Sequence, residues 1–201
     1  MTRLLVATSN PGKIRELHRA LLPEQIQVVA LDTIADTTPV EETGTTFEEN
    51  ARIKAEAYSL RTELPVLADD SGLEVDALGG EPGVKSARFG GPGLDDQGRS
   101  QLVLTRLADV ADPAARSARF VCVLAVAREG RTLATFEGVV EGRIAFEPAG
   151  ENGFGYDPLF FHPPSGCTTA ELTPAAKQAI SHRGQAIAAF LQALRHGLRI
   201  G

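Results

Sequence analysis

The sequence of 201 residues contains no tryptophan and only two cysteines. It also has no apolar run that approaches the length of a membrane-spanning helix, about 18 residues or more. Its first residues start a strand and lack the apolar core of a signal peptide. Cys122 lies in an apolar run and Cys167 in a loop, so they predict neither a disulfide framework nor a zinc site. We therefore expect a soluble, cytoplasmic protein with no membrane partner.

Basic residues are fewer than acidic ones, and the formal net charge is −6. This balance argues against nucleic acid as the main partner, although a nucleotide carried with a metal ion remains compatible with it. Lysine is scarce, with four residues among the 20 that are Lys or Arg. A coding bias towards arginine explains that total but not the positions, and Lys13 and Lys177 fall in segments of chemical character.

One compact unit is expected, because residues 1–201 contain no internal repeat, low-complexity segment or linker. The pattern predicts an α/β fold, with helices beginning near Asn10, Thr46, Thr173 and Ser181 and another over 95–107. The expected strands cover 4–7, 27–31, 65–70, 118–128, 132–140 and 159–161, the fourth and fifth forming a hairpin through Glu129-Gly130. A single domain of residues 1–201 follows.

Two adjacent carboxylates, Asp69 and Asp70, follow the apolar run 66–68 and precede Ser71 and Gly72. Neighbouring like charges repel each other, and burial raises their cost further. A strand tip that keeps both indicates a cation site or acid–base chemistry. The alternative is an acidic turn that caps a following helix.

A second polar segment, 8–13, joins the first strand to the first helix. Backbone N–H groups and the helix dipole converge there beside Lys13, which is an arrangement that binds anions. It is not a P-loop, because that motif needs glycine at Ala7 and Ser or Thr at Ile14. A capped surface helix is the alternative reading.

Three more segments place functional groups where elements end: Glu41 with Glu42, the glycine-rich loop 147–157, and Lys177 with His182 and Arg183. The loop lacks the order GxGxxG, so no dinucleotide fold is implied. Together the five segments supply cations for phosphate, carboxylates for a metal, a ring for stacking and donors for a base. This inventory predicts a nucleotide–metal site.

Six segments, in this order, resemble the inosine triphosphate pyrophosphatase family: ATSNPGK (7–13), EETG with FEENA (41–44 and 47–51), ADDSGL (68–73), LGG and PG with SAR (78–83 and 86–88), GFGYDP (153–158), and Lys177 with SHRG (181–184). The resemblance covers nearly the whole chain. It implies cleavage of ITP, dITP and XTP between the α and β phosphates, a Mg²⁺ requirement and a homodimer. It also implies a long mixed central sheet flanked by helices, with the active site in the cleft between two lobes.

Residue roles follow from the resemblance and from elementary chemistry. Asp70, with Glu41 or Glu42, would hold Mg²⁺, which accepts one or two carboxylates beside phosphate oxygens and waters. The resemblance assigns the general base to Asp70, with Asp69 in support. Lys13 would neutralise the triphosphate and act in catalysis, and the substrate-binding set would comprise Thr8, Ser9, Asn10, Pro11, Gly12, Lys13, Ser71, Phe154, Gly155, Tyr156, Asp157, Lys177, His182 and Arg183.

Base selectivity has a physical basis. Hypoxanthine and xanthine carry an acceptor oxygen at position 6, where adenine carries an amino donor, so donors from His182 and Arg183 would disfavour adenine. Sites built in this way reject analogues by about 10⁴. Phe154 would stack on the purine, whereas ordinary loop packing of Phe154 and a surface position of His182 are the alternatives. Rival functions are a pyrophosphatase of modified pyrimidine nucleotides, a sensor without turnover and, least favoured, a nucleic-acid-binding module.

Overall fold

The structure is a computed structural model and describes residues 2–200. A seven-stranded sheet with strand order β2-β1-β3-β4-β5-β6-β7 forms its framework. The strands are β1 Thr2–Val6, β2 Ile26–Ala30, β3 Val66–Val75, β4 Ser117–Arg128, β5 Arg131–Ile144, β6 Phe160–His162 and β7 Cys167–Thr168. The helices are α1 Pro11–Leu21, α2 Phe47–Ser59, α3 Asp96–Arg106, α4 Pro174–Ile180 and α5 His182–Arg195.

The sheet is mixed. β1 pairs in parallel with β2 and with β3, whereas β6 pairs antiparallel with β5 and with β7. Glu129 and Gly130, with φ of 52° and 76°, connect β4 to its neighbour β5, and a two-residue turn with both φ positive is the type I′ turn favoured in hairpins. The predicted α/β fold with a long mixed sheet is therefore confirmed.

The chain divides into two compact units. The first contains the residues up to Asp70, then Cys122–Gly138, then those from Arg183 onward; the second contains Ser71–Val121 and Val139–His182. Strands β3, β4 and β5 contribute residues to both. The prediction that one functional domain spans 1–201 stays a prediction.

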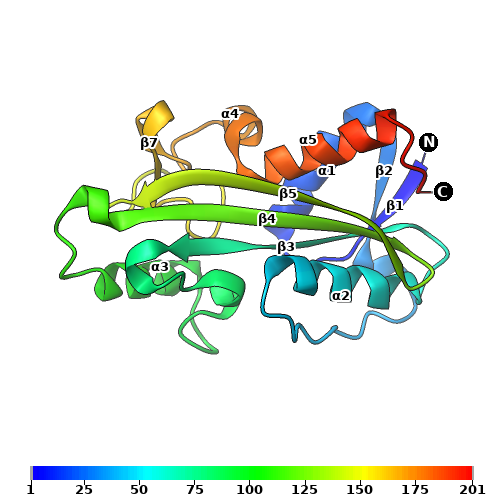
Figure 1. Cartoon of the computed structure of the whole chain (residues 1–201), viewed down its shortest axis with the longest axis horizontal. Coiled ribbons are helices and arrows are strands. Elements are labelled where there is room, and N and C mark those ends of the chain that lie inside the picture. Colours follow the sequence, from blue (N-terminus) through cyan, green and yellow to red (C-terminus); the bar gives the residue numbers. More distant parts are fainter. Residues whose placement is uncertain (1, 201) are drawn as a thin grey trace. The chain divides into compact units, whose positions relative to one another are not determined.

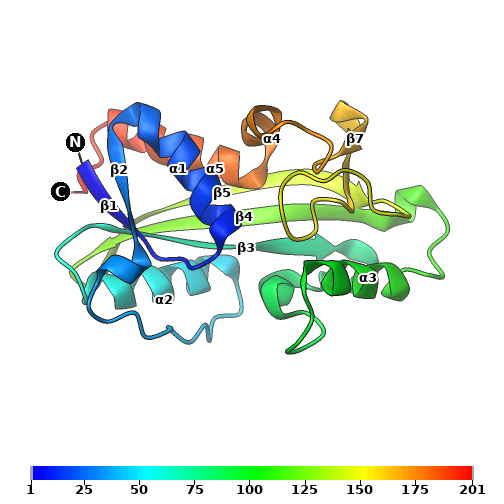
Figure 2. The same cartoon turned by 180° about the vertical axis from the view of Figure 1, so that it is seen from behind.

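In the first unit, α1 and α5 lie on one side of the strands and α2 on the other (Figures 1 and 2). Leu17 of α1 and Phe190 of α5 are fully buried in a core with Leu67 of β3 and Leu124 of β4. Local sequence fixes the helix starts. The side chain of Asn10 accepts hydrogen bonds from Gly12 N at 2.8 Å and Lys13 N at 3.2 Å, as an N-cap residue does.

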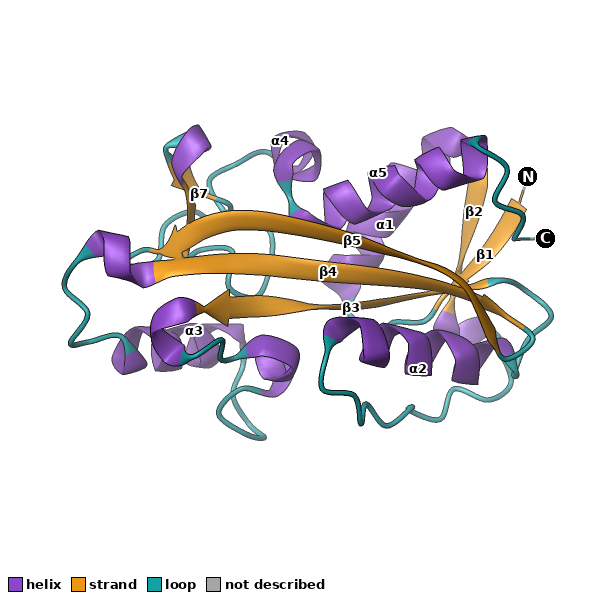
Figure 3. Cartoon of the chain, in the orientation of Figure 1, coloured by secondary structure: helices purple, strands orange, loops and turns teal. Residues whose placement is uncertain are grey.

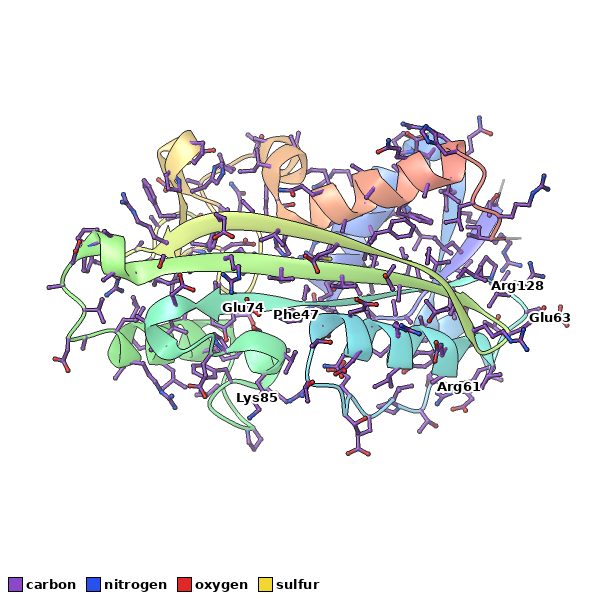
Figure 4. All side chains as sticks on the ribbon, in the orientation of Figure 1. Phe47, Arg61, Glu63, Glu74, Lys85 and Arg128 are labelled. Atoms are coloured by element: carbon purple, nitrogen blue, oxygen red, sulfur yellow. The ribbon has the colours of Figure 1, made fainter. Side chains whose placement is uncertain are left out.

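Helix α2 begins with the capping box that its sequence predicts. The Thr46 hydroxyl accepts from Glu49 N, and the Glu49 carboxylate accepts from Thr46 N. Phe47 lies in the first turn of α2 (Figure 4), and it is buried together with Ala51 and Tyr58 on one side of the helix. This face positions the side chains that lie between α2 and β3.

The second unit has its own core, formed by residues of β3, β4 and β5 with Val103 of α3 and Leu159. Arg116 is buried beside this core, and its guanidinium donates to the carbonyl oxygens of Leu107, Val110, Ile144 and Ala145. A buried guanidinium requires such partners, so Arg116 links the end of α3 to the end of β5.

The prediction that the third strand ends at Asp69 and Asp70 is wrong. β3 continues to Val75 as one uninterrupted strand (Figure 3), with Leu73 and Val75 fully buried. The strand continues because nearby lysine and arginine side chains pair with both carboxylates, and because apolar residues after Gly72 enter the second core.

Two smaller corrections are that β5 extends to Ile144 and that Cys167 begins β7. None of the helices within residues 2–200 combines the length and the apolar character that a membrane span requires.

Candidate functional site: two aspartates on opposite faces of one strand

Asp69 and Asp70 are neighbours in β3, so their side chains point to opposite faces of the sheet. Asp69 contacts Lys13 of α1 and Arg183 of α5, whereas Asp70 contacts Lys54 of α2. The backbone alternation thus separates the two charges and gives each its own cationic partners. It also gives the two carboxylates different acidities.

The Asp69 cluster comprises Asp69, Lys13, Arg183, Glu16 and Cys122. The Asp69 side chain is fully buried, with Oδ1 2.5 Å from Lys13 Nζ and Oδ2 2.7 Å from Arg183 Nε. Arg183 Nη1 lies 2.6 Å from Glu16 Oε2, and Cys122 Sγ lies 3.3 Å from Asp69 Oδ2. Burial alone would raise the pKa of Asp69, but Arg183 and Lys13 outweigh it and hold this pKa well below its usual range. Burial raises the pKa of the Cys122 thiol, which stays protonated and donates to Asp69.

The Asp70 cluster comprises Asp70, Lys54 and Glu42. Lys54 Nζ lies 2.8 Å from Asp70 Oδ1, 2.9 Å from Glu42 Oε1 and 2.9 Å from the carbonyl oxygen of Asp69. Burial lowers the pKa of Lys54, but Asp70 and Glu42 raise it by more, so the ammonium form is retained. Burial raises the pKa of Asp70 above its usual value, and Lys54 offsets this only in part. Asp70 is therefore the more basic of the two aspartates.

The Asp70 cluster suits a hard cation. Asp70 Oδ2 is buried and has no hydrogen-bond partner within the part of the chain that the structure describes. Glu42 reaches the same ammonium as Asp70, while Glu41 is exposed to solvent. Among residues 2–200, no three His, Cys, Asp or Glu side chains form a ready-made metal centre. Mg²⁺ needs only one or two carboxylates when phosphate oxygens and waters complete its shell, so Asp70 and Glu42 fit it.

The loop before α1 uses most of its own backbone donors. Thr8 N donates to the carbonyl oxygen of Val6, Asn10 N to the Thr8 hydroxyl, and Gly12 N to the Asn10 side chain. The amides of Thr8, Asn10 and Gly12 are thus engaged within the loop itself, and their part in binding phosphate stays a prediction. Lys13, whose side chain is 15% exposed, carries the positive charge of this segment.

A further group in the second unit, the Asp157 cluster, is built on Asp157, Lys177, Phe154 and Thr169. Asp157 Oδ2 accepts from Phe154 N at 2.8 Å and lies 2.5 Å from Lys177 Nζ, and Oδ1 accepts from the Thr169 hydroxyl at 2.9 Å. Lys177 Nζ lies 4.9 Å from the centroid of the Phe154 ring. The buried carboxylate thus fixes both the aromatic loop and the lysine of α4.

Glycine is required next to this carboxylate. Gly153 has φ of 80°, and a Cβ atom there would lie 2.1 Å from Asp157 Oδ2.

Gly155 N donates to Asp96 Oδ2 at 2.8 Å, and the Tyr156 hydroxyl donates to the carbonyl oxygen of Ser86 at 2.8 Å. Burial raises the pKa of Tyr156, so its hydroxyl stays a donor. Gly155 and Tyr156 therefore have structural contacts of their own in this loop.

His182 lies at the start of α5 in the second unit. Its ring stacks on Phe120, with centroids 4.8 Å apart and planes inclined by 18°. Phe120 in turn lies 4.4 Å from the Phe160 ring centroid. Phe120, itself packed against Phe160, thus fixes the plane of the imidazole. Arg183, the next residue, was expected to act with His182, and the structure gives it contacts with Asp69 and Glu16 in the first unit.

Sequence reasoning missed Lys54. It lies on α2 at a position that continues the buried face of Phe47, Ala51 and Tyr58, at helical spacings of four, three and four residues. A lysine on an apolar face, in a chain with four lysines, was the available signal. Cys122, placed by the sequence only in an apolar run, also contacts Asp69. Nothing in the sequence pointed to Glu16, because its partner Arg183 is 167 residues away.

The fold and these clusters define a class: an α/β protein with a mixed sheet that buries carboxylates against lysine and arginine, a chemistry suited to phosphate and a divalent cation. A family model narrows the class, because residues 4–193 match that of the Ham1 family. The chain belongs to the Ham1 family.

Curated relatives and solved structures agree with this assignment. The chain is 49% identical over 187 residues to a dITP/XTP pyrophosphatase of Bacillus subtilis, covering 93% of this chain and 94% of that protein. It is 50% identical over 199 residues to a dITP/XTP pyrophosphatase of Shigella flexneri, covering 98% and 100%. A HAM1 protein structure from Coxiella burnetii matches with a TM-score of 0.86 and 42% identity, over 98% of this chain and 100% of that one.

Proposed function

We propose that this protein hydrolyses dITP, ITP and XTP to the monophosphate and pyrophosphate, and so removes deaminated purines from the nucleotide pool. The observation that carries the proposal is the Asp70 cluster, in which Lys54 fixes the buried carboxylate of Asp70 next to that of Glu42 and leaves Asp70 Oδ2 without a hydrogen-bond partner among the described residues. Relatives at 49–50% identity that are named dITP/XTP pyrophosphatases support the substrate class.

Asp70 acts as the general base. Its buried Oδ2, which has no hydrogen-bond partner among the described residues, can accept the proton of a water that attacks the α-phosphorus. Lys54 holds Oδ1 of Asp70 by a hydrogen bond of 2.8 Å, so the other oxygen keeps one orientation. When bound by Asp70 and Glu42, Mg²⁺ would neutralise charge on the phosphate oxygens. Glu41 is the alternative ligand.

Asp69 has a different task. Its pKa lies well below the usual range, so it stays ionised and is a poor proton acceptor. Its role is to hold Lys13 and Arg183 in place. Lys13 is the more exposed of these two cations, with 15% of its side chain accessible against 2% for Arg183, and it supplies the positive charge for the triphosphate.

The purine is recognised by side chains of the second unit. The ring of Phe154 stacks on the base. Asp157 fixes the positions of Lys177 and of the backbone of Phe154 by accepting from both. His182, fixed in its plane by Phe120, donates to the 6-oxo group. Adenine presents a donor at that position and would leave a buried donor unpaired, at a cost of about 1–3 kcal/mol. The homodimer and the cytoplasmic location stay predictions.

Product analysis of the wild-type protein separates this proposal from its rivals. dITP, XTP, dUTP and ATP are incubated in parallel with Mg²⁺, and nucleotide products and pyrophosphate are quantified. We expect the monophosphate and pyrophosphate from dITP and XTP, with much slower release from ATP and dUTP. Preferred cleavage of dUTP would support the pyrimidine alternative, and tight binding of dITP without product would support a sensor.

A further inference from the structure

The segment that carries Glu41 and Glu42, residues 41–46, is called the acidic loop here. It has no helix or strand of its own, and the backbone amides of Gly44, Thr45 and Thr46 donate to side chains in the first turn of α2. Thr45 N and Thr46 N donate to Glu49 Oε2 at 2.6 and 3.2 Å, and Gly44 N donates to Asn50 Oδ1 at 2.8 Å. The end of this loop is therefore fixed by two side chains of α2.

Asn50 differs from Glu49 in being fully buried. The orientation of its amide follows from its neighbour, because Gly44 N–H can only donate and must face the oxygen of Asn50. Its Nδ2 is buried and has no hydrogen-bond partner among the described residues. An asparagine that keeps an unsatisfied donor in the interior is unfavourable for stability, so the contact with Gly44 needs a reason other than folding.

Gly44 is matched to this contact. A Cβ atom on Gly44 would lie 2.6 Å from Glu49 Cβ, 2.7 Å from Asn50 Oδ1 and 3.0 Å from Asn50 N. Only glycine lets the loop backbone approach α2 this closely. Lys54 lies four residues after Asn50 on α2, so the two side chains are on the same side of the helix. Lys54 pairs with Glu42, which lies two residues before Gly44 in the acidic loop.

We propose that Asn50 is a positioning residue for the metal end of the site: with Gly44 it forms a clamp that sets the position of Glu42 beside Asp70 and so determines the affinity for Mg²⁺. Asn50 fixes the loop backbone, and Lys54 fixes the carboxylates of Glu42 and Asp70. The inference rests on the proposed function, because it assigns the cation to Asp70 and Glu42.

The test uses the full chain with Asn50→Leu, which keeps the side-chain volume and removes the acceptor, and with Gly44→Ala, which pushes the loop away. Hydrogen–deuterium exchange of the peptide covering 41–46 measures directly how firmly the clamp holds the loop backbone. The Mg²⁺ concentration that gives half-maximal dITP hydrolysis measures the effect of the clamp on the metal site. We expect faster exchange in both variants, and a half-saturating Mg²⁺ concentration raised about tenfold, as found for residues that orient metal ligands.

Ser59→Ala is the matched control. The Ser59 hydroxyl accepts from Gly130 N at 2.8 Å, so this change removes the same kind of contact at the other end of α2. Its melting temperature should fall at least as far as that of Asn50→Leu, with unchanged Mg²⁺ dependence. Asn50→Asp, which keeps the acceptor, should restore slow exchange of the acidic loop.

The outcomes are distinct. Unchanged exchange at 41–46 in Asn50→Leu overturns the clamp, and faster exchange with an unchanged half-saturating Mg²⁺ concentration overturns its link to the metal. An equal rise of the half-saturating Mg²⁺ concentration in Ser59→Ala would mean that the rise comes from lower stability of α2, and would also overturn the proposed role of Asn50. If the wild-type protein releases no pyrophosphate from dITP, the proposed function itself fails, and the exchange experiment still decides whether the clamp exists.

Discussion

Replacing Asp69 with Asn should destabilise the protein strongly, whereas the same change at the next residue should not. Asp69 lies between Lys13 and Arg183, and the side chain of Arg183 is 2% exposed. Removing one partner of a buried ion pair costs about 3–5 kcal/mol, because the other charge stays buried without compensation. Glu16 remains beside Arg183, and Lys13 can turn towards solvent. We therefore expect the lower end of this range, about 3 kcal/mol.

Asp70 has the opposite thermodynamic character. Burial raises its pKa, which means that its ionised form is disfavoured in the folded state relative to the unfolded one. An Asn at this position removes that penalty and keeps an oxygen for Lys54. The free energy of unfolding of Asp70→Asn should therefore stay within about 1 kcal/mol of the wild-type value.

The assay is thermal and urea denaturation of the wild type and both variants at pH 7. For a chain of this length, a loss of about 3 kcal/mol lowers the melting temperature by about 6–12 °C. The pH dependence follows from the lowered pKa of Asp69. Its contribution is present above the unfolded-state value, about 3.9, and is lost as the pH falls through the folded-state pKa. The loss of unfolding free energy in Asp69→Asn should thus be constant from neutral pH down to the unfolded-state value, about 3.9, and become smaller below it.

Equal destabilisation by the two substitutions would refute this reasoning, since it would mean that the faces of β3 do not give the two carboxylates different partners. A deficit of Asp69→Asn that grows in acid would refute the assigned direction of the pKa shift.

Two other substitutions test the clusters separately. Lys54→Met should lower the turnover of dITP by about 10²-fold or more, as loss of a positioned charged donor does, and a steady-state kcat near the wild-type value would show that Lys54 is dispensable. Gly153→Ala should lower the free energy of unfolding by about 1–3 kcal/mol, because of the positive φ, and should also weaken dITP binding, because its Cβ would meet Asp157. Calorimetry on the variant measures the unfolding and the binding of dITP. Unchanged dITP affinity would show that this loop does not contribute to binding of the base.

Local features of the fold could be predicted from the sequence because they depend on neighbouring residues. The N-cap at Asn10, the capping box at Thr46 and the hairpin turn at Glu129-Gly130 all follow from spacings of two to four residues. Ile187 and Phe190 of α5 lie at a helical spacing of three residues, and both are buried in the core of the first unit.

The partners of the two aspartates could not be predicted. Alternation along a strand shows that Asp69 and Asp70 face opposite sides, but it does not show which helix covers which side. Arg183 and Asp69 are separated by 114 residues, so their contact depends on the packing of α5 against the sheet. For the same reason Lys54 was missed, and so were the contacts of Arg183 with Asp69 and Glu16. That Arg183 also reads the base stays a prediction.

The central claim is that Asp70 performs the chemistry and Asp69 does not. Its most direct test is the release of pyrophosphate and monophosphate from dITP by Asp70→Asn, with Mg²⁺ at saturation and folding verified by the melting temperature. We predict a folded protein that releases no detectable pyrophosphate. Turnover near the wild-type rate in a folded Asp70→Asn protein would contradict the assignment of the general base and of the metal ligand together.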